Sequence, residues 1–154
     1  MNIELRNVTI GQQIRGLSVT VGDGNVLNIT GSKGVGKTTL LRALLGFVAV
    51  DEGYISIDGE LLTMSSAPWF RKRMAYVPQL LEVPEGYDAV PTDYMSLLER
   101  AVSSDKKLLI IDEPREALSY DDNERRERLI SEAAGRGATV VAVNTSITQN
   151  QIQL

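Results

Sequence analysis

A glycine-rich segment with two lysines and two threonines has the residue types and spacing of a phosphate-binding loop. Residues 31–38 read Gly-Ser-Lys-Gly-Val-Gly-Lys-Thr, which fits G-x-x-x-x-G-K followed by Ser or Thr at every fixed position. Glycines let backbone N–H groups turn toward phosphate oxygens, and the following helix N-terminus adds about half a positive charge. We expect Lys37 to reach the β- and γ-phosphates of a nucleotide, Thr38 to offer its hydroxyl to Mg²⁺, and Thr39 to bind the α-phosphate. The predicted nucleotide-binding residues are Gly31, Ser32, Lys33, Gly34, Val35, Gly36, Lys37, Thr38 and Thr39.

Two adjacent carboxylates, Asp112 and Glu113, follow a continuous apolar run at residues 108–111. Such a run is typical of a central parallel strand, and the carboxyl end of that strand lies beside the phosphate loop in a doubly wound sheet. There Asp112 would hold Mg²⁺ through water, and Glu113 would orient and deprotonate the attacking water. The chain has neither His nor Cys, which leaves Glu113 as the candidate general base and excludes thiol nucleophiles, disulfides and the usual zinc sites. Taken without the loop, the pair would fit a surface turn after a strand equally well.

The elements that must position these residues alternate between strands and helices. Strands at 3–10 and 17–21 are expected to pair antiparallel, because both alternate apolar and polar residues. Further strands are expected at 26–29, 54–57, 74–77, 108–111 and 139–143, helices at 37–45, 92–102 and 121–134, and a loop at 80–91. This order predicts an α/β fold of the P-loop NTPase type, with a mainly parallel sheet flanked by helices and a small N-terminal antiparallel part, in one domain over residues 1–154.

Smaller local features carry two further expectations. Thr92 is expected to cap the helix at 92–102, with Asp93 in its first turn. Trp69 and Phe70 are expected in the core, with the basic residues 71–73 on a solvated face.

Composition narrows the class of protein. The chain has 154 residues and a net charge of −4, and no basic block stands out, so nucleic acid is not an expected partner. No apolar run is long enough for a bilayer span, and the first residues lack the order of a signal peptide. A cytoplasmic protein without a membrane span of its own is therefore expected.

Several further segments, in order along the chain, resemble the nucleotide-binding subunits of ABC (ATP-binding cassette) proteins. Residues 51–59 are similar to the turn and strand after the family's first helix, and residues 71–79 to the stretch that ends in the Q-loop glutamine. Residues 111–114, Ile-Asp-Glu-Pro, resemble the strand that ends in the family's acidic pair. The resemblance implies that the ligand is ATP with Mg²⁺, and that Gln79 touches Mg²⁺ or the attacking water. It thereby implies catalytic roles for Glu113, Lys37 and Gln79, and metal ligands in Thr38, Gln79 and Asp112.

The sequence departs from the family pattern at four places. The stretch from Gln79 to Asp112 is considerably shorter than the family's helical subdomain, which leaves a reduced subdomain at about 80–103. The Leu-Ser-Gly-Gly-Gln signature of that subdomain is absent from the sequence, and Thr145 stands where the family has its switch histidine. Ser119 occupies the D-loop aspartate position, and the stretch Ile-Gly-Gln-Gln at 10–13 replaces the aromatic residue that stacks on adenine, which leaves the choice of ATP or GTP open.

These departures bear on partners and on turnover. In the family the signature is supplied in trans, so a homodimer of this chain cannot close the site, whereas a complete ABC subunit could. A membrane subunit is the other partner that the resemblance implies. Through that subunit the chain would lie at the inner face of the membrane. Lys33 is an extra cation that could partly replace the missing donor. A ParA/MinD-like loop also carries an extra lysine, but here that position is Ser32, so the register argues against it.

Two functions follow from the sequence. One is a slow P-loop ATPase, which the retained Glu113 favours. The other is a regulatory or structural subunit that binds ATP without hydrolysing it and works through a partner. The absent signature and Thr145 favour the second.

Overall fold

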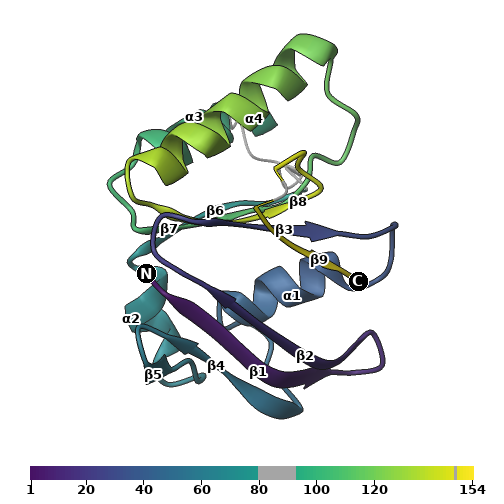
Figure 1. The fold of residues 1–154 in the computed structure, drawn as a ribbon, viewed down its shortest axis with the longest axis vertical. Helices are drawn as coiled ribbons and strands as arrows, with labels where there is room; N and C mark the ends of the chain where they lie inside the picture. The colour runs from purple at the N-terminus through teal and green to yellow at the C-terminus, as the bar shows by residue number, and fades with distance from the viewer. Residues whose placement is uncertain (80–92, 148) are drawn as a thin grey trace, which may run out of the picture.

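The computed structural model describes residues 1–79, 93–147 and 149–154. Two sheets and four helices make up this part of the chain (Figure 1). The antiparallel sheet has the order β2-β1-β4-β5 and consists of β1 (Ile3–Ile10), β2 (Ile14–Val21), β4 (Glu52–Ile57) and β5 (Glu60–Leu61). The parallel sheet has the order β6-β7-β8-β3-β9 and consists of β3 (Val26–Thr30), β6 (Met74–Val77), β7 (Leu108–Ile111), β8 (Thr139–Val143) and β9 (Asn150–Gln153). The helices are α1 (Lys37–Leu44), α2 (Ala67–Arg71), α3 (Tyr94–Ser103) and α4 (Tyr120–Gly135).

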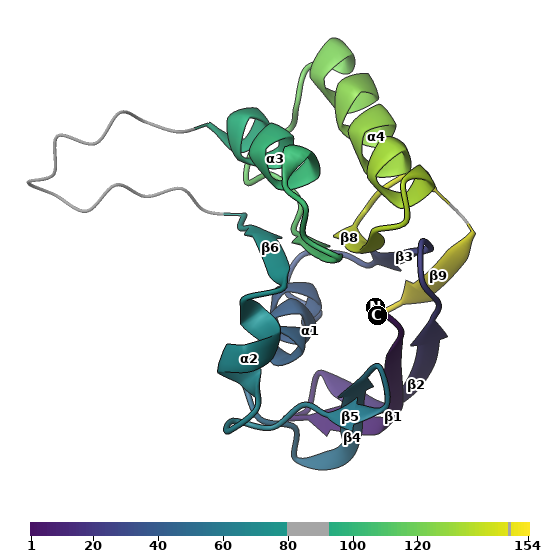
Figure 2. The same ribbon diagram turned by 90° about the vertical axis from the view of Figure 1, so that its left-hand side faces the viewer.

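The parallel sheet is covered on both faces. Helix α1 lies between the two sheets, and α3 and α4 lie together on the opposite face of the parallel sheet (Figures 1 and 2). Along β7, Leu108 and Ile110 join the apolar cluster around α1, whereas Leu109 and Ile111 join the cluster under α3 and α4. All four side chains are 0% exposed, and each contributes about 1.5–3 kcal/mol by leaving water. The α/β class and the two-sided burial of this strand are therefore confirmed.

The ends of the predicted helices need one correction within the described residues. Asp93, not Thr92, caps α3: its Oδ1 accepts a hydrogen bond of 2.7 Å from the backbone N–H of Ser96. Thr92 and the expected loop at 80–91 lie outside the described residues, as does the first part of the expected subdomain at about 80–103. Within the described residues of that range, Tyr94–Ser103 form α3.

Helix α2 and strands β5 and β9 have no counterpart among the elements expected from the sequence. Helix α2 has only five residues, too few for a helical period to stand out. Phe70 is buried on its inner side, but the expectation that Trp69 is in the core is wrong, since that side chain is 49% exposed. Trp69 lies on the outer side of the helix, where the guanidinium carbon of Arg73 is 3.5 Å from its ring centroid.

The order of the central strands determines which of the segments that follow them are neighbours. Strand β8 pairs in parallel with both β3 and β7, so it separates the strand before the phosphate loop from the strand before Asp112. The carboxyl ends of parallel strands lie at the same edge of a sheet, and ligands bind outside that edge. Residues that follow β8 must therefore lie between the loop and the acidic pair. In the described part of the chain, none of the helices combines the length and apolar character needed to cross a bilayer.

Candidate functional site

The glycine-rich loop connects β3 to α1, as the motif predicts. Gly34 and Gly36 have φ values of 84° and 105°, in the left-handed region where a side chain is strained. Gly36 is also the N-cap of α1 and brings no side chain to its first turn. The backbone N–H groups of that turn are thus left to a ligand, and the helix dipole favours an anion there.

Lys37 begins α1 and is directed back over the loop. Its side chain is 6% exposed, and its Nζ donates to the backbone oxygen of Gly31 at 2.5 Å. The same Nζ lies 3.1 Å from Oε1 of Glu113. A buried ammonium must have polar partners, and both of these could be exchanged for phosphate oxygens.

Thr38 and Asp112 bring two hard oxygen ligands together. The hydroxyl of Thr38 donates to Oδ2 of Asp112 at 2.9 Å, and the backbone N–H of Glu113 donates to the other carboxylate oxygen at 2.8 Å. Burial raises the pKa of Asp112, with the nearby charge of Glu113 adding to the rise; both hydrogen bonds and Lys37 oppose it. Oxygen ligands of this kind fit Mg²⁺, which usually combines one or two protein oxygens with phosphates and water. Among the described residues there is no cluster of three or more His, Cys, Asp or Glu that would bind a metal without such help.

A cavity of about 180 Å³ opens between the loop and the acidic pair. Its lining includes the predicted residues Lys33, Gly34, Gly36, Lys37, Thr38, Thr39, Gln79 and Glu113, together with Gln13. Asp112, at 1% exposure, does not line this cavity but contacts Thr38, which does, and lines a second cavity together with Thr38 and Gln79. Gly31 contacts the site through its backbone oxygen, whereas Ser32 and Val35 do not line the cavity.

Two residues at the site were missed by sequence reasoning. Asn144 follows β8 directly, and its Nδ2 donates to Oε2 of Glu113 at 2.6 Å. The strand order predicts such a residue, but the position of β8 between β3 and β7 cannot be read from local pattern. Gln13 donates from Nε2 to the backbone oxygen of Gly34 at 3.0 Å. In the sequence, the stretch that contains Gln13 differs from the family pattern only by lacking the aromatic residue, which gives no sign of this contact.

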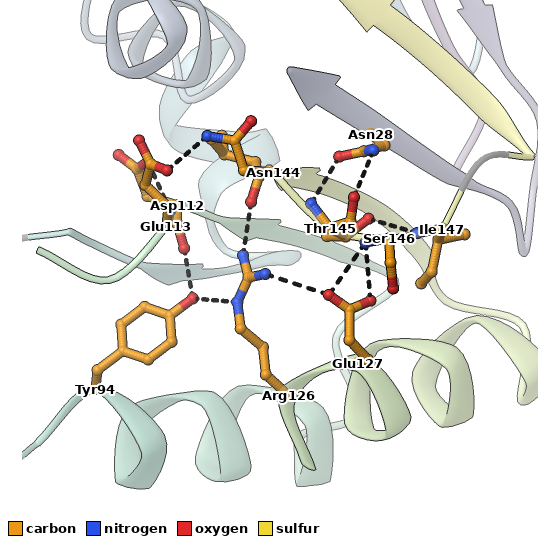
Figure 3. Close-up of polar contacts among 11 residues, drawn as sticks. Asn28, Tyr94, Asp112, Glu113, Arg126, Glu127, Asn144, Thr145, Ser146 and Ile147 are labelled. Carbon is orange, nitrogen blue, oxygen red and sulfur yellow. Dashed lines mark hydrogen bonds and ion pairs between the residues drawn. The ribbon is translucent and has the colours of Figure 1, made fainter. Parts of the chain in front are cut away.

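A buried network of hydrogen bonds connects the backbone at the acidic pair to α3 and α4 (Figure 3). The hydroxyl of Tyr94 donates to the backbone oxygen of Asp112 at 2.5 Å and accepts from Nε of Arg126 at 2.9 Å. Arg126, at 2% exposure, also donates to the backbone oxygen of Val143 at 2.8 Å. Burial raises the pKa of Tyr94, and the charge of Arg126 opposes that shift. One tyrosine on α3 and one arginine on α4 therefore fix the carboxyl ends of β7 and β8.

Comparisons with known proteins agree on one family. Residues 14–91 match the family described as ABC transporter. The sulfate/thiosulfate import ATP-binding protein CysA of Methylococcus capsulatus is 42% identical over 64 residues, which cover 39% of this chain and 18% of that protein. The cytochrome c biogenesis ATP-binding export protein CcmA of Novosphingobium aromaticivorans is 28% identical over 148 residues, which cover 82% of this chain and 78% of that protein.

The solved structures extend this likeness to the fold. A dimeric ATP-binding cassette bound to ADP and Pi, in a post-hydrolysis state, has a TM-score of 0.76 to this chain. The alignment covers 99% of this chain and 94% of that one at 18% sequence identity. At this identity the likeness shows the fold alone.

Proposed function

Because the chain belongs to the ABC transporter family of ATP-binding proteins, we propose that it binds ATP with Mg²⁺ at residues 31–39 and hydrolyses it slowly to ADP and phosphate. The main support for the proposal is that residues of the phosphate loop contact both residues of the acidic pair. Thr38 lies 2.9 Å from Asp112, and Lys37 lies 3.1 Å from Glu113. The residues proposed to bind phosphate, to hold the metal and to act as general base therefore line one cavity or contact a residue that lines it.

Each residue has a distinct part in the proposed reaction. The glycine amides and the N-terminus of α1 bind the phosphates, and Lys37 turns from Glu113 to the β- and γ-phosphates. Thr38 and Asp112 would hold Mg²⁺, which supplies charge neutralisation when bound. Gln79 lines the same cavity, and in this proposal its amide touches the metal or the attacking water.

The chemical step uses one protein base. The oxygen of a water molecule forms a bond to the γ-phosphorus while the bond from that phosphorus to the bridging oxygen breaks. A proton of the water passes to Glu113, and ADP leaves with the bond's electron pair. Lys33 is exposed at the cavity and, in this proposal, adds positive charge near the γ-phosphate in place of the missing signature.

A second candidate, an ATP-binding subunit that does not hydrolyse, is favoured by Thr145. This residue stands at the switch-histidine position, but its Oγ1 accepts from the backbone N–H of Ile147 at 3.1 Å, and it does not line the cavity. With the signature absent as well, two groups expected near the γ-phosphate are missing from this chain. ATP would then act as a regulatory or structural ligand.

The proposed partners follow from the same departures. A complete ABC subunit would supply the signature, and a membrane subunit would receive the conformational change; the relatives named above are import and export ATP-binding proteins. In this proposal the chain works in the cytoplasm and reaches the membrane only through such a partner. Nucleic acid is not a proposed partner, in keeping with the net charge of −4.

Phosphate release by the wild type and Glu113→Gln, combined with calorimetry of Mg-ATP binding, tests the proposal. We expect the wild type to release phosphate about a hundredfold faster than Glu113→Gln, since a general base contributes about 10²–10⁴-fold. Lys33→Ala is expected to lose about tenfold in turnover, less than the loss of a buried donor. If the wild type and Glu113→Gln release phosphate equally, at the background rate, and bind Mg-ATP tightly, the chain is a non-hydrolysing ATP-binding subunit and not an ATPase. If calorimetry detects no binding of Mg-ATP, both proposed functions are wrong.

A further inference from the structure

The carboxylate of Glu113 is held on both oxygens. Lys37 lies 3.1 Å from Oε1, and the amide of Asn144 donates to Oε2 at 2.6 Å. When Lys37 turns to the phosphates, as the proposed function requires, Asn144 remains. One oxygen of Glu113 then stays fixed by the amide, and the other is released to accept a proton.

The backbone around Asn144 is hydrogen-bonded to β3 and to α4. Asn144 has a φ of 51°, a left-handed conformation that asparagine tolerates better than most residues. Its backbone N–H donates to the oxygen of Ile29 at 2.8 Å, which continues the pairing of β8 with β3. The preceding carbonyl, that of Val143, accepts from buried Arg126 at 2.8 Å.

The residue after Asn144 is clamped by an asparagine of the neighbouring strand. Asn28, on β3 and 1% exposed, donates from Nδ2 to the backbone oxygen of Thr145 and accepts from its N–H, both at 2.9 Å (Figure 3). The pair of hydrogen bonds resembles one more step of the parallel ladder made by a side chain. A buried amide left without these partners would cost about 1–3 kcal/mol, so the turn has one strongly preferred conformation.

The next backbone group is bound as well. The N–H of Ser146 donates to both carboxylate oxygens of Glu127, at 3.1 and 3.2 Å. With Asn28 and Arg126, this contact anchors the turn to β3 and α4. The backbone of Asn144 is therefore held by its neighbours, and from this position its exposed side chain is within hydrogen-bond distance of Glu113.

We propose that Asn144 is a positioning residue for Glu113, the proposed general base. This inference rests on the proposed function, because it assigns Asn144 a role in the same hydrolysis. The amide donates to Glu113 and takes no part in the proton transfer itself. It restricts the rotation of the carboxylate, so that the free oxygen faces the attacking water.

The test uses Asn144→Gly, because glycine removes the amide while accepting the left-handed backbone. We expect the turnover number to fall about tenfold or more, while the dissociation constant for Mg-ATP stays within about twofold. Asn144→Asp keeps the size but puts a second negative charge beside Glu113, and should lower turnover further. Asn123→Ala, on the exposed face of α4, is the matched control and should behave as the wild type.

The outcomes separate the two proposals. Wild-type release above that of Glu113→Gln, with Asn144→Gly equal to wild type, overturns the role of Asn144 and keeps the ATPase. Equal loss of binding and turnover in Asn144→Gly would assign the residue to structure and also overturn the inference.

A second measurement needs no turnover. In the chain without nucleotide, the side-chain amide NMR signals of Asn144 should shift in Glu113→Ala and stay unchanged in Asn123→Ala. Unchanged Asn144 signals in Glu113→Ala would reject the contact, whether or not the wild type hydrolyses ATP.

Discussion

Asp112 is a carboxylate whose burial disfavours its charged form. It is 1% exposed, and its hydrogen bonds come from two neutral groups, the hydroxyl of Thr38 and the N–H of Glu113. A charge in this position is costly unless a cation compensates it. Lys37 compensates part of this charge, and in the proposed function Mg²⁺ bound with ATP would compensate the rest, so binding would add stability at this site.

Replacing Asp112 by Asn should reverse this balance. We expect Asp112→Asn without nucleotide to raise the free energy of unfolding by about 1 kcal/mol at about pH 7, because the buried charge is removed while the size is kept. The same variant should lose the added stability that Mg-ATP gives the wild type. Thermal unfolding with and without Mg-ATP measures both effects. A variant that is less stable than wild type without nucleotide would contradict the account.

At the scale of elements, α3 is joined to the end of β7 by the hydroxyl of Tyr94. This hydroxyl is buried and donates to the oxygen of Asp112 while accepting from Arg126. Its pKa is raised by burial, with the charges of Asp112 and Glu113 adding and that of Arg126 opposing. The neutral hydroxyl therefore contributes stability that is complete below the unfolded-state pKa of about 10 and is lost as the pH rises through the folded-state value.

Tyr94→Phe should remove that pH dependence. Near pH 7 the variant should lose about 1–2 kcal/mol of unfolding free energy, because the oxygen of Asp112 and the Nε of Arg126 lose a partner. Between about pH 9 and about pH 11 the wild type should lose more stability than the variant. Tyr120→Phe is the control, since that side chain is 79% exposed. Equal loss over this range in wild type and Tyr94→Phe would contradict the prediction, and urea unfolding at each pH measures it.

The central elements could be predicted from sequence because their signals are local. The apolar runs at 108–111 and 139–143 became β7 and β8 with the expected bounds, and the loop motif lies between a strand and a helix. Strand order, by contrast, depends on contacts distant in sequence. The place of Asn144 beside Glu113 follows from that order, and Arg126 in a polar helix carries no local sign of being buried.

For the whole molecule, the absent signature leads us to expect that a second chain would increase the slow turnover proposed for this one. A complete ABC subunit could close the site on residues 31–39 of this chain, whereas this chain has no signature to offer in return. We expect such a partner to raise phosphate release about tenfold or more, and a partner with its signature substituted to have no effect. Release measured in mixtures, with each chain's glutamate changed in turn, assigns the active site. Equal stimulation by both partners would contradict this dependence.

Helix α1 lies between the two sheets, with Leu40, Leu41 and Leu44 in the same apolar cluster as Ile3 and Ile57. Residues 37–39 of its first turn line the cavity, so a ligand bound there would contact this helix directly. Amide protons of β1 and β4, on the far side of that helix, should then exchange with deuterium more slowly once the cavity is filled, although no ligand atom is near them. Binding of a ligand at the edge of the parallel sheet would thus slow the local opening of the antiparallel sheet.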